Sequence, residues 1–70
     1  MDLMNIFVNG KKIEIVSGIS LFEYLDSNGL MNQKAFAVAL NQEIIQKDDY
    51  VLKILSDGDR VEIVKAIGGG

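Results

Sequence analysis

The feature that most constrains the fold of this chain is a pair of alternating segments joined by Asn9-Gly10. In the first segment, MNIFVNG, apolar residues at every second position lie on one side of an extended chain: Met4, Ile6 and Val8. The second segment, KKIEIV, alternates in the same way. Asn-Gly suits the two-residue type I′ turn, because both of its residues adopt positive φ at low cost. These features predict a β-hairpin.

A change of period directly after the hairpin predicts a helix. Ser20 and Glu23 have the spacing of a capping box, in which each side chain accepts a hydrogen bond from the other residue's backbone N–H. Apolar residues then recur at helical spacing, and Asn28-Gly29 is typical of a helix end. We therefore expect a helix over about residues 21–27.

The second half of the chain contains short strand-like segments separated by turns. AFAVALN predicts a buried strand, and QEIIQ predicts a second strand after a turn at Asn41-Gln42. VEIVKAI predicts the final strand, after a turn at Asp57-Gly58 in SDGDR. KDDYVLKIL fits either a 3₁₀ turn with a short strand or an irregular crossing, so its pattern leaves the strand boundaries within 46–56 open.

The predicted order of elements is β-β-α-β-(β)-β, which indicates an α+β fold with a mixed sheet of four to five strands and one main helix packed on one face. Periodicity alone gives only this class. If the last strand pairs in parallel with the first and lies centrally, the plan is that of the β-grasp, or ubiquitin-like, fold. The sharp break in composition comes at Ile67-Gly68. We therefore expect a single domain over 1–67 and a flexible glycine tail over 68–70.

The composition argues against an independent catalyst. The 70 residues include no cysteine and no histidine, so the chain lacks a thiolate nucleophile, the usual general base and the commonest metal ligand. We expect no cofactor or metal bound by the chain itself. The net charge of −3 also argues against nucleic-acid binding, which requires a basic surface.

The sequence gives no sign of membrane insertion or export. No apolar run approaches the ~20 residues that span a bilayer. The first residues, MDLMNIFVNG, contain an early acid and no basic region of the kind that opens a signal peptide. We expect a cytoplasmic protein with no membrane association, monomeric when free.

The three glycines Gly68, Gly69 and Gly70 indicate a chemical role for the main chain. Without Cβ atoms they form a thin thread that reaches roughly 10 Å when extended, enough to enter a narrow channel in a partner protein. A carboxylate at its end becomes reactive once ATP adenylates it, because a sulfur or nitrogen nucleophile then displaces AMP. The plainer interpretation is a frayed chain end.

Four segments together resemble the ThiS family of thiamine-biosynthesis sulfur carriers: MNIFVNGKKIEI, SLFEYL, FAVALNQEIIQKDDY and SDGDRVEIVKAIGGG. The resemblance spans essentially the whole chain. It implies that Gly70 is adenylated and then converted to a thiocarboxylate, with Gly69 and Gly70 matching the family's terminal diglycine. The small subunit of molybdopterin synthase, or another ubiquitin-like carrier or modifier, is the alternative.

The resemblance also implies a set of partners. A ThiF-like adenylating enzyme brings the Mg-ATP site, and a cysteine desulfurase or related donor supplies the sulfur. The thiocarboxylate then passes the sulfur to the thiazole synthase ThiG. On this view the chain is a protein co-substrate and not an enzyme.

A docking surface for these partners is predicted beside the root of the tail. Phe7 lies on the opposite side of its strand from the apolar series, and Val64 and Ala66 alternate away from Val61 in the last strand. If these strands are neighbours, an exposed apolar patch results, of the kind that marks interfaces: Phe7, Val64, Ala66 and Ile67. The alternative is that these residues are simply apolar strand ends, or that KDDYVLKIL covers them. Asp57 and Asp59 are interpreted as turn residues and not as metal ligands.

Overall fold

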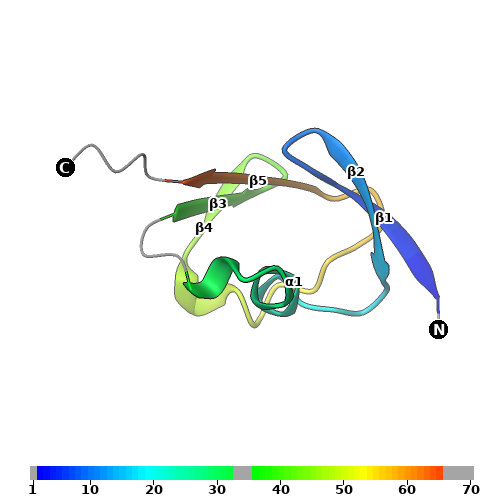
Figure 1. The fold of residues 1–70 in the computed structure, drawn as a ribbon, viewed down its shortest axis with the longest axis horizontal. Coiled ribbons are helices and arrows are strands. Elements are labelled where there is room, and N and C mark those ends of the chain that lie inside the picture. Colours follow the sequence, from blue (N-terminus) through cyan, green and yellow to red (C-terminus); the bar gives the residue numbers. More distant parts are fainter. Residues whose placement is uncertain (1, 33–35, 66–70) are drawn as a thin grey trace.

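The computed structural model of the protein describes residues 2–32 and 36–65. Within them a single sheet is covered on one face by a helix and two 3₁₀ turns (Figure 1). The elements, in chain order, are β1 (Leu3–Val8), β2 (Lys11–Val16), α1 (Leu21–Ser27), η1 (Leu30–Asn32), β3 (Phe36–Leu40), β4 (Glu43–Ile45), η2 (Lys47–Asp49) and β5 (Arg60–Lys65).

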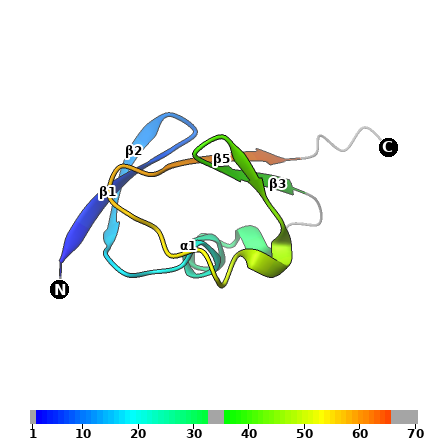
Figure 2. The ribbon, with the colours of Figure 1, turned by 180° about the vertical axis from the view of Figure 1, so that it is seen from behind.

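The five strands are arranged in the order β2-β1-β5-β3-β4. The last strand therefore lies at the centre, between two hairpins that come earlier in the chain (Figures 1 and 2). It pairs in parallel with β1, where Phe7 is opposite Arg60 and Val8 opposite Val61, and antiparallel with β3. This mixed sheet with one helix on one face confirms the expected α+β class and its β-grasp plan.

Both hairpins turn through two residues of positive φ. Asn9 has a φ of 51° and Gly10 one of 83°, as the Asn-Gly dipeptide predicted. At the second turn Asn41 has a φ of 51° and Gln42 one of 73°. Because glutamine rarely adopts positive φ, this second turn depends on the strands that flank it more than on its own sequence.

Helix α1 begins with the predicted capping box. The Ser20 hydroxyl oxygen accepts from the Glu23 N–H at 3.0 Å, and the Glu23 carboxylate accepts from the Ser20 N–H at 3.0 Å. Two donors that a helix start leaves without partners are thereby satisfied. Within the described ranges, no helix has the length and apolar character needed to cross a membrane.

The crossing over 46–56, which the sequence left open, is mostly irregular. It contains η2 and one isolated bridge between Ser20 and Ile54. The crossing is fixed to the start of α1, because the Leu21 N–H donates to the Lys53 carbonyl at 2.7 Å and the Leu55 N–H to the Ile19 carbonyl at 2.9 Å. These contacts hold the helix against the sheet and lead the chain into β5.

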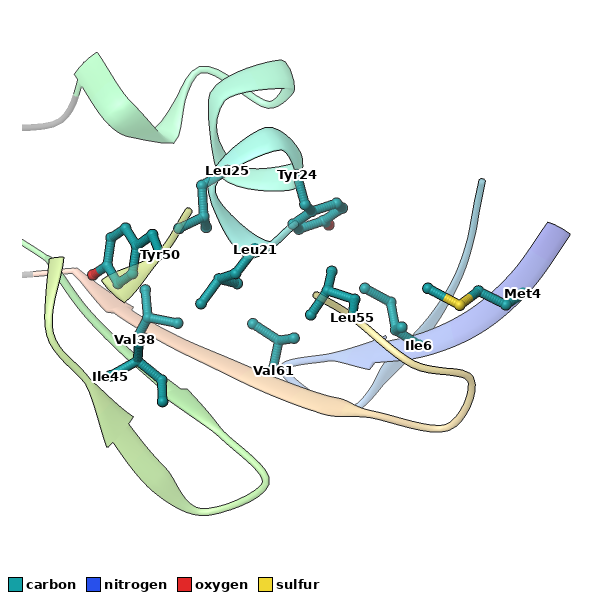
Figure 3. Close-up of a cluster of buried hydrophobic side chains, with 10 residues drawn as sticks. All are labelled: Met4, Ile6, Leu21, Tyr24, Leu25, Val38, Ile45, Tyr50, Leu55 and Val61. Atoms are coloured by element: carbon teal, nitrogen blue, oxygen red, sulfur yellow. The ribbon is translucent and has the colours of Figure 1, made fainter. Parts of the chain in front are cut away.

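The core fills the space between α1 and the inner face of the sheet (Figure 3). Its buried hydrophobic residues are Met4, Ile6, Leu21, Tyr24, Leu25, Val38, Ile45, Tyr50, Leu55 and Val61. Burying each large aliphatic side chain contributes about 1.5–3 kcal/mol. Val61 of β5 and Val38 of β3 are fully buried, so the central strand is part of the core.

Candidate functional site

The predicted reactive tail comes two residues after the end of β5 in the sequence. Ala66, Ile67 and the glycines Gly68, Gly69 and Gly70 lie outside the described residues, so the division into a domain over 1–67 and a tail over 68–70 stays a prediction. The structure does describe the strand that carries these residues as far as Lys65. The geometry of the candidate site is therefore that of β5 and the sheet face around it.

The two halves of β5 are held differently. From its second residue onward β5 pairs with β3, from Val61 opposite Leu40 to Lys65 opposite Phe36. On its other side the pairing with β1 covers only Arg60 and Val61. Among the residues that the structure describes, the half of the strand that leads to the tail thus has a neighbouring strand on one side only.

The side chain of Asn9 extends the β1 side of this pairing. Its amide oxygen accepts from the Ile63 N–H at 2.7 Å, and its amide nitrogen donates to the Ile63 carbonyl at 3.2 Å. The backbone N–H of Asn9 donates to the Val61 carbonyl at 2.8 Å, so Val61 is where the backbone ladder stops. The side-chain amide therefore replaces the next strand residue, two positions further along β5.

Asn41 contacts the other side and the other end of β5. Its amide oxygen accepts from the Arg60 N–H at 2.9 Å, and its backbone N–H donates to the Arg60 carbonyl at 2.7 Å. Its amide nitrogen donates to the Asp59 carboxylate at 3.0 Å. The sequence pattern predicts only a turn role for both asparagines. No local signal points to these contacts, because Asn9 and Ile63 are 54 positions apart.

The outer face of the sheet, away from α1, carries two of the predicted docking residues. Phe7 is opposite Arg60 in the register, and Val64 is opposite Ala37 of β3. Phe7 and Val64 point to the same face but are separated by four positions along β5, roughly 13 Å at 3.3 Å per residue. Glu62 lies between them, so they do not form one continuous apolar surface.

Val64 instead belongs to an apolar surface formed with β3 and β4. Ala37 is its direct partner, and Ala39, on the same side of β3, is opposite Ile44 of β4. Val64 is 64% exposed and Ile44 65% exposed, although both are large and apolar. We call these four residues the outer patch: Ala37, Ala39, Ile44 and Val64. Sequence reasoning missed three of them, although alternation with the buried Val38 and Ile45 could have placed them on the outer face.

Phe7 lines a separate, shallow pocket beside the first hairpin turn. Its volume is about 250 Å³, and it is lined by Phe7, Gly10, Arg60, Val61 and Glu62. Phe7 is half-buried there. Its surroundings are partly charged, which distinguishes this pocket from the outer patch.

The acidic turn before β5 has a structural role. The Asp57 carboxylate accepts from the Asn5 N–H at 2.9 Å, and the Asp59 carboxylate accepts from the Ser56 N–H at 2.8 Å. Gly58 has a φ of 86°, as a tight turn requires. In residues 2–32 and 36–65 no three acidic side chains come together in a way that would hold a metal ion.

The two tyrosines pack in the core. Burial raises the pKa of the Tyr24 and Tyr50 phenols above the ordinary value of 10.0, because the charged form loses its hydration. The rings of Tyr50 and Phe36 stack with their centroids 6.3 Å apart. Both phenols therefore stay neutral at physiological pH and serve packing.

Comparison with known proteins adds a family to this geometry. Residues 5–70 match the model of the ThiS family. The sulfur carrier protein ThiS of Escherichia coli is 28% identical over 67 residues, which cover 96% of this chain and 100% of that protein. A thiazole synthase of Paramagnetospirillum magneticum is 34% identical over 67 residues, and there the chain spans only 20% of the relative's length.

A solved structure supports the same relation. The crystal structure of the thiamine biosynthesis protein (ThiS) from Geobacter metallireducens superposes with a TM-score of 0.81 at 29% sequence identity. The match covers 96% of this chain and 100% of that one. The likeness therefore extends over the hairpins, the helix and the central strand together.

Proposed function

This chain belongs to the ThiS family, and from that membership we propose that it is the sulfur carrier of thiamine biosynthesis, acting as a protein co-substrate of other enzymes. The observation that carries the proposal is that the family match extends to Gly70, so the terminal glycines belong to the matched region. The absence of cysteine and histidine from the sequence agrees with this role, because the sulfur would be held on the main chain.

The proposed chemistry takes place at the carboxylate of Gly70. A carboxylate oxygen attacks the α-phosphorus of ATP, pyrophosphate leaves, and an acyl adenylate forms. A sulfur nucleophile then attacks the acyl carbon and AMP leaves. Hydrosulfide gives the thiocarboxylate directly, whereas the persulfide of a desulfurase gives an acyl disulfide, which a thiol such as cysteine then reduces to the thiocarboxylate. Gly68 and Gly69 would form the thin part of the chain that enters the partner's channel. ATP and Mg²⁺ would be bound by the adenylating partner and not by this chain.

Thiazole synthase is the partner with the most direct support. One protein of that name contains a segment that is similar to 96% of this chain. That segment makes up 20% of its length, and the rest of that protein has no counterpart in this chain. A carrier and its acceptor that occur in one polypeptide must work near each other. We propose that the thiocarboxylate delivers its sulfur to such a synthase, after a ThiF-like enzyme and a cysteine desulfurase or related donor have loaded it.

The outer patch is the surface that we propose for docking. Its apolar side chains lie on β5, the strand that leads to the tail, and on β3 and β4 at one side of it. Exposed apolar clusters often mark interfaces. Ala66 and Ile67, which follow β5 in the sequence, extend the proposed contact toward the tail, whereas Phe7 would contribute from its separate pocket.

Mass spectrometry of the intact protein tests the proposed function. Incubation with the cognate adenylating enzyme, ATP, a desulfurase and cysteine should replace one oxygen by one sulfur on Gly70. A variant that lacks Gly70 should fold normally and stay unmodified. A chain that gains no sulfur under these conditions would contradict the proposal. An isopeptide-linked ladder would instead indicate a modifier, and a long-lived complex with molybdopterin synthase would indicate its small subunit.

A further inference from the structure

We propose that Asn9 is a positioning residue for the loading reaction, because its side chain fixes the direction in which β5 delivers the tail. This inference rests on the proposed function. It starts from the two hydrogen bonds that the Asn9 amide makes to both main-chain groups of Ile63. A residue needed only for the turn requires a tolerance of positive φ and no contact with another strand.

The bonds of Asn9 act where β5 has the least support. Within the described residues, β1 pairs with β5 only as far as Val61, and β3 alone accompanies the strand from Ile63 to Lys65. A strand paired on one side pivots about that pairing more easily than a strand held on both sides. The Asn9 amide supplies the second side at Ile63, two residues before β5 ends.

The reactive end lies several residues beyond this point. Seven positions separate Ile63 from Gly70, and they span at most about 25 Å in the extended form that a narrow channel requires. A pivot of roughly 10° at Ile63 would displace the end of β5 at Lys65, two positions and about 7 Å further on, by about 1 Å, and a misplacement of ~1 Å can cost ~100-fold in rate. Once the outer patch is docked, the direction of β5 limits which tail conformations reach the adenylating site.

Asn41 provides a matched control within the same molecule. It occupies the same position of a two-residue turn, with the same φ of 51°, and its amide also bonds to β5. It contacts Arg60, at the start of β5, which pairs with Phe7 of β1 and is followed at once by Val61, where β1 and β3 both pair with the strand. Loss of its side chain removes a comparable set of hydrogen bonds and leaves the tail end of β5 supported.

The experiment compares Asn9→Gly with Asn41→Gly in steady-state loading by the adenylating enzyme, with the carrier as the varied substrate. Glycine keeps the positive φ of both turns and removes the whole side chain, amide included, and its added backbone freedom is the same in the two variants. We expect Asn9→Gly to lower kcat roughly five- to tenfold while KM stays within about twofold, because the reacting end is misplaced but docking is intact. Asn41→Gly should change both constants less than about twofold.

Amide hydrogen exchange measured in parallel verifies that each contact is lost. The Ile63 N–H should exchange faster in Asn9→Gly, and the Arg60 N–H faster in Asn41→Gly. Asn9→Asp keeps the acceptor for the Ile63 N–H but loses the donor to its carbonyl, so it should give an intermediate kcat.

Three results would overturn the inference. They are a wild-type kcat in Asn9→Gly despite faster exchange at Ile63, an effect on KM alone, and an equal loss of kcat in the two glycine variants. A wild-type carrier that is not loaded at all would overturn the proposed function, which is a different outcome.

Discussion

The two faces of the sheet differ more from each other than any two of its strands do. The inner face carries Val38 and Val61 fully buried beneath α1, whereas the outer face leaves Val64 and Ile44 about two-thirds exposed. The outer side of β5 also carries the charged residues Arg60 and Glu62, but Val64 and Ile44 are as apolar as the residues of the inner face. Among residues 2–32 and 36–65, α1 covers the inner face, and the core side chains fill the space between them (Figure 3). The difference shows that the inner face maintains the fold, and it agrees with the proposal that the outer face binds partners.

The largest expected effect is a loss of stability, and it compares a residue on the inner face of β5 with one on the outer face of the same strand. Val61→Ala should lower the free energy of unfolding by about 2–3 kcal/mol, because it removes buried methyl groups and leaves a cavity. Val64→Ala should change it by less than about 0.5 kcal/mol, since that side chain is 64% exposed. Denaturant unfolding of the two variants measures both values. Equal losses would contradict the contrast between the faces.

The next effect concerns binding. Ile44→Lys places a charge in the outer patch and should weaken binding to the adenylating enzyme about tenfold or more, which is ~1.4 kcal/mol. Titration calorimetry with the partner enzyme measures it. Leu52→Lys is the control, because Leu52 is 71% exposed and lies outside the outer patch. If both variants bind as the wild type does, the outer patch is not the docking surface.

A smaller loss of stability is expected when the start of α1, the helix that covers the inner face, loses its cap. Ser20→Ala should lower the free energy of unfolding by about 1 kcal/mol, since it removes half of the capping box of α1. Thermal or urea unfolding measures the change. Ser56→Ala serves as a control, because Ser56 uses its backbone N–H and not its hydroxyl to bond to Asp59. A similar loss in both variants would show that the cap contributes little.

The smallest effect follows from the raised pKa of the two buried tyrosines. Because the folded state holds these protons more tightly than the unfolded state, their contribution to stability is complete below the ordinary pKa of about 10 and is lost as pH rises above it. Tyr24→Phe should therefore flatten the fall of the free energy of unfolding above that pH. Urea titrations across the alkaline range measure the slope. An unchanged slope in Tyr24→Phe would contradict this.

Sequence reasoning succeeded where the signal is local. The turn at Asn9-Gly10 and the capping box of Ser20 and Glu23 each depend on residues at most three positions apart, and both are confirmed. The α+β class followed from the order of such elements. The crossing over 46–56 was left open because its contacts are with the start of α1, which the local pattern does not reveal.

The candidate site was only partly predictable. Alternation along the strands is enough to turn Phe7 and Val64 away from the core, but the same alternation fits any even shift between neighbouring strands. The register places Val64 beside Ala37 and leaves Phe7 beside Arg60. Register also decides that Ile44 belongs to the outer patch, because β4 pairs with β3 so that Ile44 is opposite Ala39.

By itself the sequence determined the short-range structure of this protein: where the chain turns, where its helix begins, which side of each strand is apolar, and that it has no cysteine or histidine for chemistry of its own. Tertiary structure alone decided which strands became neighbours and in what register, and so which exposed residues share a surface. It also directed the amide of Asn9 to Ile63. The physical reason is range, since turn and cap preferences act over a few residues, whereas register and side-chain-to-strand bonds depend on segments joined only by packing of the whole core.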